Sequence, residues 1–251
     1  MGGPQWIPET EELRAIALEA KAEQGVAWAM HWTGTRHWDR GDYAAASTAM
    51  EQACAMYESL SDRRSLANGL SLWALCLVEL GHFEKAVGLL ERSRMLATKY
   101  RLTGLWATPP LTYTAEAYLR AAELMPDAAG RAGALALAKP ACARATRQGR
   151  RVADASAADA LRLNGIHAWL VGERTRAERL WTQGIATAEA MNAKLALARL
   201  HHALGTRSGD PAHLETARLL FAKMEFTRLR GRLAARDPSD FLGCNCVHGH
   251  G

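Results

Sequence analysis

The sequence lacks any apolar segment long enough to cross a membrane. Its longest strictly apolar run, from Leu72 to Val78, is far shorter than the roughly 20 residues that a membrane-spanning helix needs. The first residues, from Met1 to Thr10, include glycine, proline and acidic residues but no apolar core of a signal peptide. We therefore expect a soluble cytoplasmic protein that does not bind a membrane.

Sequence motifs that carry enzyme chemistry are also missing. There is no G-x-x-x-x-G-K-[ST] phosphate loop, no H-E-x-x-H zinc motif, no G-x-S-x-G nucleophile motif and no G-x-G-x-x-G dinucleotide motif. We expect the chain not to be an enzyme and to bind no cofactor through such a motif.

Residues that favour strands are scarce, whereas residues that favour helices are abundant. Alanine, leucine and arginine dominate the middle of the chain and β-branched residues are sparse, which favours helix over strand. Hydrophobic residues make up 49% of the chain and charged residues 23%, a balance typical of a folded protein. The net charge of +5 is well below that of a dedicated nucleic-acid binder, so we do not expect nucleic acid to be the partner.

The chain has few cysteines, and their number is odd. The five are Cys54, Cys76, Cys142, Cys244 and Cys246. The first three stand within helical patterns, where cysteine usually serves as a small buried apolar residue. An odd count without a secretory leader favours a reducing compartment over a disulfide framework.

An alanine recurs at a fixed interval after a glycine-containing turn. Gly41-Asp42-Tyr43 precedes Ala46, Gly81-His82-Phe83 precedes Ala86, Gly172-Glu173-Arg174 precedes Ala177, and a fourth stretch contains Ala217. Ala46 and Ala86 are 40 residues apart, as are Ala177 and Ala217, and 91 residues separate Ala86 from Ala177. A period in this range indicates a solenoid, and the longer interval leaves room for one degenerate unit.

Each unit of this repeat has the pattern of a helical hairpin. Leu70, Trp73, Ala74 and Leu77 have helical spacing, and Gly81 follows the last of them as a helix-ending residue. Two helices joined by so short a turn must be antiparallel neighbours. The sequence therefore predicts an all-α fold, a right-handed superhelical solenoid of about five antiparallel hairpins.

The chain divides into three segments on this interpretation. We expect a disordered N-terminus at 1–9, the repeat domain at 10–233 and a flexible tail at 234–251. The expected hairpins are 26–60, 64–99, 105–150, 154–191 and 192–232, preceded by a helix from Thr10 to Gln24. In the degenerate middle, Pro109-Pro110 should end one element and Pro140 should kink or open another, because proline lacks an amide hydrogen.

The small residues and turn glycines occur at the spacing of a known repeat. Three units carry it, with Gly34, Gly41, Tyr43, Ala46 and Ala53 in the first, Ala74, Gly81, Phe83 and Ala86 in the second, and Gly165, Gly172, Ala177 and Gly184 in the third. This pattern resembles the tetratricopeptide repeat family over roughly residues 10–233. The step of 40 residues exceeds the family's usual repeat of about 34. In that respect the chain is similar to the C-terminal helical arrays of bacterial signal-transduction ATPases, cyclase-linked ATPases and regulatory kinases.

The resemblance implies a function in protein–protein recognition. We expect a scaffold, or a sensor or docking module of a bacterial regulatory system, that binds a peptide or partner helix. The inner helices of the hairpins would line a concave groove for this partner.

Two clusters are candidates for partner binding. Arg144, Arg147 and Arg151 share a helical face in a stretch without acidic residues, which suits an acidic peptide or a phosphate backbone, although a solvated helix face has the same pattern. Trp28 and Trp32 are four residues apart and share a face, either as a binding hot spot or as core.

The C-terminal tail offers an alternative function. Cys244, Cys246, His248 and His250 alternate with other residues, and thiolate with imidazole suits zinc or copper(I). The alternative prediction is therefore a metal-binding protein that acts through this tail, unless the tail's composition is accidental.

Overall fold

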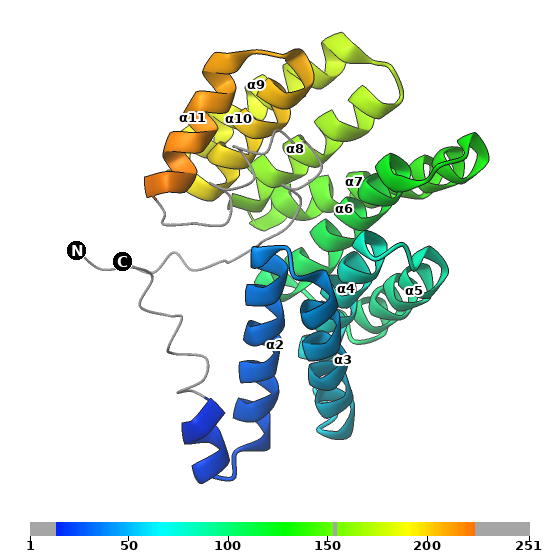
Figure 1. Ribbon diagram of the computed structural model, residues 1–251, viewed down its shortest axis with the longest axis vertical. Coiled ribbons are helices and arrows are strands. Elements are labelled where there is room, and N and C mark those ends of the chain that lie inside the picture. Colours follow the sequence, from blue (N-terminus) through cyan, green and yellow to red (C-terminus); the bar gives the residue numbers. More distant parts are fainter. Residues whose placement is uncertain (1–13, 153–154, 224–251) are drawn as a thin grey trace.

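The described part of the protein is entirely helical in its regular structure. The computed structural model describes residues 14–152 and 155–223, and these contain helices and no strand (Figure 1). The helices are α2 (Glu23–Arg40), α3 (Tyr43–Ser59), α4 (Arg63–Glu79), α5 (Phe83–Lys99), the short 3-10 helix η1 (Gly104–Ala107), α6 (Thr108–Leu124), α7 (Ala128–Val152), α8 (Ala155–Leu170), α9 (Arg174–Ala190), α10 (Lys194–Ser208) and α11 (Pro211–Lys223). The predicted all-α fold class is confirmed.

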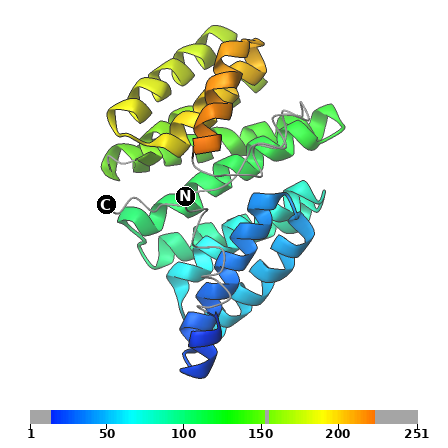
Figure 2. The same cartoon turned by 60° about the vertical axis from the view of Figure 1, so that its left-hand side comes forward.

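Consecutive helices pack as pairs, and the pairs follow one another through the molecule. The pairs are α2 with α3, α4 with α5, α6 with α7, α8 with α9, and α10 with α11. Figure 2 shows them stacked from the α2 end to the α11 end. The first helices α4, α6, α8 and α10 also contact one another in this order. This arrangement is that of an all-α repeat array; its superhelical form and hand stay predictions.

The turn glycines occupy positions that other residues adopt only with strain. Gly41, Gly81 and Gly172 have φ angles of 75°, 79° and 87°, the left-handed region that ends a helix. Asp42 then caps α3, because its Oδ1 accepts a hydrogen bond from the amide of Ala45 at 3.2 Å. These residues therefore set the sharp reversal between two helices of a pair.

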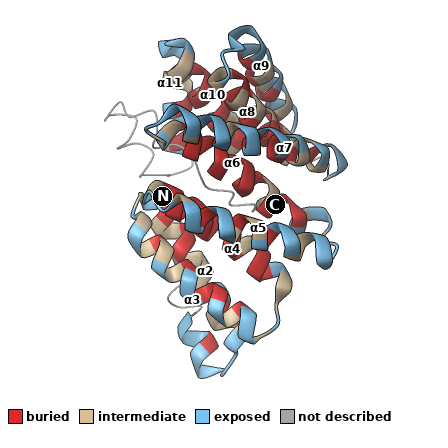
Figure 3. Ribbon diagram, turned by 90° about the vertical axis from the view of Figure 1, so that its right-hand side faces the viewer, coloured by how far each residue is buried: buried red, intermediate tan, exposed pale blue. Residues whose placement is uncertain are grey.

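The recurring alanines mark the contact positions of the array. Ala46, Ala86, Ala177 and Ala217 are all at most 1% exposed. Figure 3 shows buried residues on the facing sides of the helices, and α4 and α6 are buried over most of their length. The alanine period therefore reports helix packing, as its spacing predicts.

Two details of the predicted elements are wrong, and a third is wrong in part. Pro109-Pro110 begins α6 instead of ending a helix, because the first turn needs no amide hydrogen from these residues. Pro140 lies inside α7 and does not open the helix, which continues through it on an exposed side where water can bond the freed carbonyl; the kink stays a prediction. The helix expected from Thr10 to Gln24 ends earlier than predicted. Residues 14–19 are helical, Lys21 then has a φ of 52°, and a separate helix, α2, begins at Glu23.

Candidate functional site

An apolar cavity of about 180 Å³ opens between α5 and α7. Its lining includes Val87 and Leu90 from α5, Tyr118 and Ala121 from α6, and Gly133 and Leu137 from α7. We call this cavity the α5–α7 slot. The sequence analysis did not find it, because it is formed by residues from different helix pairs.

The slot exists because one step of the array is packed differently from its neighbours. The helices α3 and α7 pack extensively against the next pair, whereas α5 has only a small contact with α6. The chain between α5 and α6 also contains η1 in place of a tight turn. A Cβ added to Gly133 would meet no heavy atom within 4 Å apart from its chain neighbours and its own helix backbone. The slot is therefore open beside Gly133.

The predicted arginines lie on the same helix as one wall of the slot. Gly133 and Leu137 are followed along one stripe of α7 by Arg144, Arg147 and Arg151, at successive steps of four, seven, three and four residues. We call these three residues the arginine stripe. Arg144 is half-buried, and Arg147 and Arg151 are exposed. All charged residues of α7 are basic, so the apolar slot continues into a cationic surface.

Charged side chains act on the pKa of Tyr118, a lining residue of the slot. Burial raises the pKa of the Tyr118 phenol, and Glu91 raises it further, while Arg144 and Arg94 act in the opposite direction. Arg94 on α5 donates a hydrogen bond to Glu91 from Nε to Oε2 at 2.8 Å. Arg144, Arg147 and Arg151 form no ion pair with the described residues. The positive charge of the stripe is therefore not neutralised by that part of the chain.

The predicted tryptophans lie elsewhere, on α2. Trp28 is 45% exposed, and Trp32 is half-buried with its ring 6.2 Å from that of His31. The helix α2 does not contribute to the slot. The structure therefore does not bring the tryptophans together with the arginine stripe.

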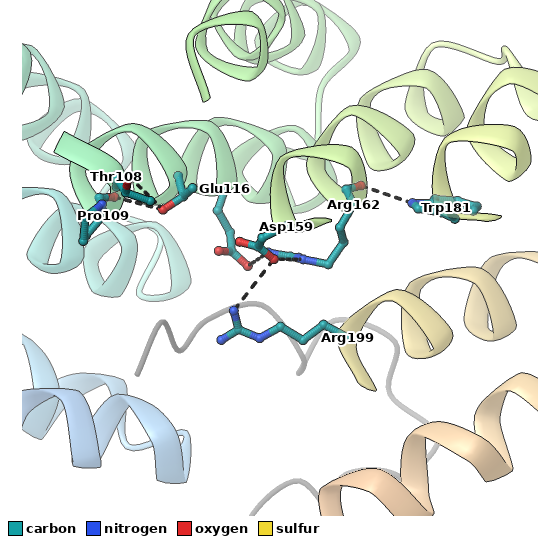
Figure 4. Close-up of polar contacts among 8 residues, drawn as sticks. Thr108, Pro109, Glu116, Asp159, Arg162, Trp181 and Arg199 are labelled. Carbon is teal, nitrogen blue, oxygen red and sulfur yellow. Dashed lines mark hydrogen bonds and ion pairs between the residues drawn. The ribbon is translucent and has the colours of Figure 1, made fainter. Parts of the chain in front are cut away.

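A buried ion network joins the first helices of three pairs (Figure 4). Arg162 of α8 donates from Nη2 to Glu116 Oε1 of α6 at 3.2 Å and from Nε to Asp159 Oδ1 at 2.6 Å. Arg199 of α10 lies with Nη1 3.9 Å from the same Asp159 Oδ1. All four side chains are at most 5% exposed, so the network is part of the interior.

The pKa values in this network differ between its two acids. Burial raises the pKa of Glu116 above its usual range, and Arg162 and Arg199 offset only part of this effect. Burial also opposes ionisation of Asp159, but Arg162 and Arg199 hold its pKa below the usual value. Asp159 is therefore the ionised partner that anchors Arg162.

A second ion network joins α4, α6 and α10. Arg120 of α6 is bonded to Glu79 of α4 and to Glu123 of its own helix, and Glu123 accepts a hydrogen bond from Arg207 of α10. Each network holds two acids and two arginines. The facing sides of the first helices are thus occupied by acids and arginines that already contact one another.

The described residues offer no metal centre. They contain no group of three or more histidine, cysteine or acidic side chains arranged to hold an ion. Burial raises the pKa of the Cys54 and Cys142 thiols to about 12 and that of Cys76 still higher, which keeps all three protonated. They are buried in the core, as predicted. The predicted metal ligands Cys244, Cys246, His248 and His250 lie outside the described residues.

Within the described residues, no helix is both long and apolar enough to cross a membrane. Comparison with known proteins assigns no family, since no family model matches the chain and no curated protein matches it. The chemistry of the slot and of the arginine stripe is therefore the basis for a functional assignment.

Proposed function

We propose that this chain is a protein-docking module of a regulatory system and that it binds a peptide or helix of a partner protein. The observation that carries the proposal is the α5–α7 slot, an apolar opening on an array of stacked helix pairs. Apolar grooves between helices are a recurrent way to bind an amphipathic helix. The resemblance to tetratricopeptide arrays supports the same class of function.

The size of the slot favours a side chain over a whole small molecule. Pockets for cofactors and drug-sized ligands have volumes of roughly 300–1,000 Å³, whereas the slot has about 180 Å³. This space is enough for one or two apolar side chains that project from a longer ligand. A peptide therefore fits the slot better than a cofactor does.

The slot is also a better docking surface than the facing sides of the first helices. In the proposed right-handed superhelix, those helices line the inner groove. The buried Glu79 is already bonded to Arg120 of the next helix pair. The buried Asp159 is bonded to Arg162 of its own helix and lies 3.9 Å from Arg199 of the next pair. A partner there would have to displace buried ion pairs, which is costly, so we place docking at the slot.

The test is selection of peptides from a random library on the immobilised full chain, followed by titration of the enriched peptides. We expect saturable binding that is lost in Gly133→Leu, because the new side chain fills the slot. The matched control is Gly88→Leu on α5, another exposed helical glycine, where an added Cβ would meet no atom within 4 Å. If no peptide binds above a scrambled control, or if both variants bind equally well, the docking proposal is wrong.

A further inference from the structure

The α5–α7 slot and the arginine stripe are adjacent features of one helix, α7. Leu137, at the wall of the slot, precedes Arg144 by seven residues and Arg151 by fourteen. At a rise of 1.5 Å per residue, these arginines lie about 10 Å and about 21 Å along the helix from Leu137. An apolar opening and a line of three positive charges therefore follow each other over about four helical turns.

We infer that this surface binds an acidic amphipathic helix of a partner protein. An apolar side chain of the partner enters the slot, and carboxylates on the same face of the partner pair with Arg144, Arg147 and Arg151. The inference rests on the proposed docking function and adds to it the partner's chemistry and direction of binding.

Charge complementarity supports an acidic partner. The helix α7 carries Arg131, Lys139, Arg144, Arg147, Arg150 and Arg151 and no acidic residue. The arginine stripe forms no ion pair with the described residues. A row of carboxylates is the peptide chemistry that neutralises such a surface, since guanidinium groups bind carboxylates through paired hydrogen bonds.

Matching helical geometry explains why the partner should be helical. The slot and the stripe lie on one line of α7, with steps of three, four and seven residues. A partner helix that lies alongside α7 presents its own residues with the same rise. Arg144, Arg147 and Arg151 follow Leu137 by 7, 10 and 14 residues, so an apolar anchor followed by acids at these same intervals would place every charge beside an arginine.

The slot also distinguishes a peptide from nucleic acid. A phosphate backbone could pair with the arginines, but it has no apolar side chain to fill a cavity lined by Val87, Leu90 and Leu137. Binding to nucleic acid would therefore depend on the stripe and not on the slot. The acidic helix depends on both.

The test uses three helical peptides of about 15 residues with a fluorescent label, titrated with the full chain. The first has a leucine anchor followed by glutamates about 7, 10 and 14 residues later, and the second has lysines in place of the glutamates. The third keeps the glutamates and replaces the anchor with serine. We expect only the first peptide to bind tightly, and its affinity to fall as NaCl rises from about 0.05 M to about 0.5 M.

A matched pair of triple variants tests the stripe itself. Replacing Arg144, Arg147 and Arg151 with glutamine should weaken binding of the first peptide roughly 10-fold, since exposed ion pairs are individually weak. Replacing Arg131, Lys139 and Arg150 with glutamine removes the same charge from other faces of α7 and should change the affinity less than about 2-fold. Because Arg144 is half-buried, the double variant Arg147→Glu with Arg151→Glu serves if the first triple variant does not fold.

The outcomes separate this inference from the docking proposal. If library peptides bind at the slot but the lysine peptide equals the glutamate peptide, or both triple variants weaken binding equally, docking stands and the acidic partner is wrong. If a DNA or RNA duplex binds through the stripe and is unaffected by Gly133→Leu, the acidic helix is also wrong. If no peptide binds at all, both proposals fail.

Discussion

Arg120 of α6 donates two hydrogen bonds to Glu79 of α4, from Nε to Oε1 at 2.7 Å and from Nη2 to Oε2 at 3.1 Å, and both side chains are 4% exposed. This paired geometry joins the first helices of two successive helix pairs. Because the two charges are buried, each depends on the other to offset its loss of water.

Replacing Arg120 with methionine should therefore destabilise the array strongly. The change removes the buried partner of Glu79, and we expect the free energy of unfolding to fall by about 3–5 kcal/mol, measured by urea denaturation. The double variant Arg120→Met with Glu79→Leu should recover part of this loss, because no buried acid is left without its arginine.

The control Arg176→Met breaks an exposed pair with Glu173 and should cost less than about 1 kcal/mol. If both single variants lose the same free energy of unfolding, the buried pair of Arg120 and Glu79 contributes no more to stability than an exposed pair does.

Replacing Gly165 of α8 should lower stability for a steric reason. A Cβ at this position would lie 2.1 Å from Nε1 of Trp181, and that nitrogen donates a hydrogen bond to the carbonyl of Arg162 at 3.1 Å. We expect Gly165→Ala to lower the free energy of unfolding by about 1–3 kcal/mol, because the tryptophan must move in a packed core. Gly88→Ala on α5 meets no atom within 4 Å and should be neutral or raise stability by up to about 1 kcal/mol. A neutral Gly165→Ala would mean that Trp181 is not held in this place.

The helix pairs could be predicted because their signals are local. Gly41, Gly81 and Gly172 end helices through their own backbone conformation, and the buried alanines repeat with the packing. The effect of proline could not be read in the same way. Pro109 and Pro140 both lie in helices, since what matters is the turn in which a proline falls and whether its freed carbonyl reaches water.

The candidate site was predictable only in part. The face shared by Arg144, Arg147 and Arg151 follows from helical spacing, but the slot beside it depends on a loose contact between α5 and α6 that no local pattern records. The buried ion networks left no periodic signal. Glu79 is the last residue of α4 and Glu116 lies in the middle of α6, whereas Asp159 and Arg199 lie near the starts of α8 and α10, so these residues do not recur at equivalent positions of the repeat.

The metal-binding tail stays a prediction with a direct test. We expect titration with Cu⁺ or Zn²⁺ to show tight binding by the full chain and none by a chain truncated after Asp240. The described residues contain no competing group of three metal ligands. Binding that survives the truncation, or no binding by the full chain, would exclude the Cys244 and Cys246 tail as the metal site.

His202 of α10 should make stability depend on pH in a defined window. Its side chain is buried, and burial lowers the pKa of His202 to about 3, with Arg207 and Arg162 acting in the same direction. In the unfolded chain this imidazole takes up a proton near its ordinary pKa of about 6.5. Between these values the unfolded state binds one more proton than the folded state, so the free energy of unfolding decreases as pH falls.

Comparing the native chain with the variant His202→Gln separates the effect of His202 on the pH dependence of stability from the effects of the other histidines. The native chain should lose about 2 kcal/mol more than the variant between pH 7 and pH 5, at a slope of up to about 1.4 kcal/mol per pH unit. Above pH 7 both slopes should be the same, because His202 is then neutral in both states. Asp159 and Glu116 titrate in the unfolded chain near pH 4 and affect both proteins alike, so urea unfolding at pH 7, 6 and 5 is the decisive measurement. A stability difference that does not change with pH would show that His202 accepts a proton in the folded array as readily as in water.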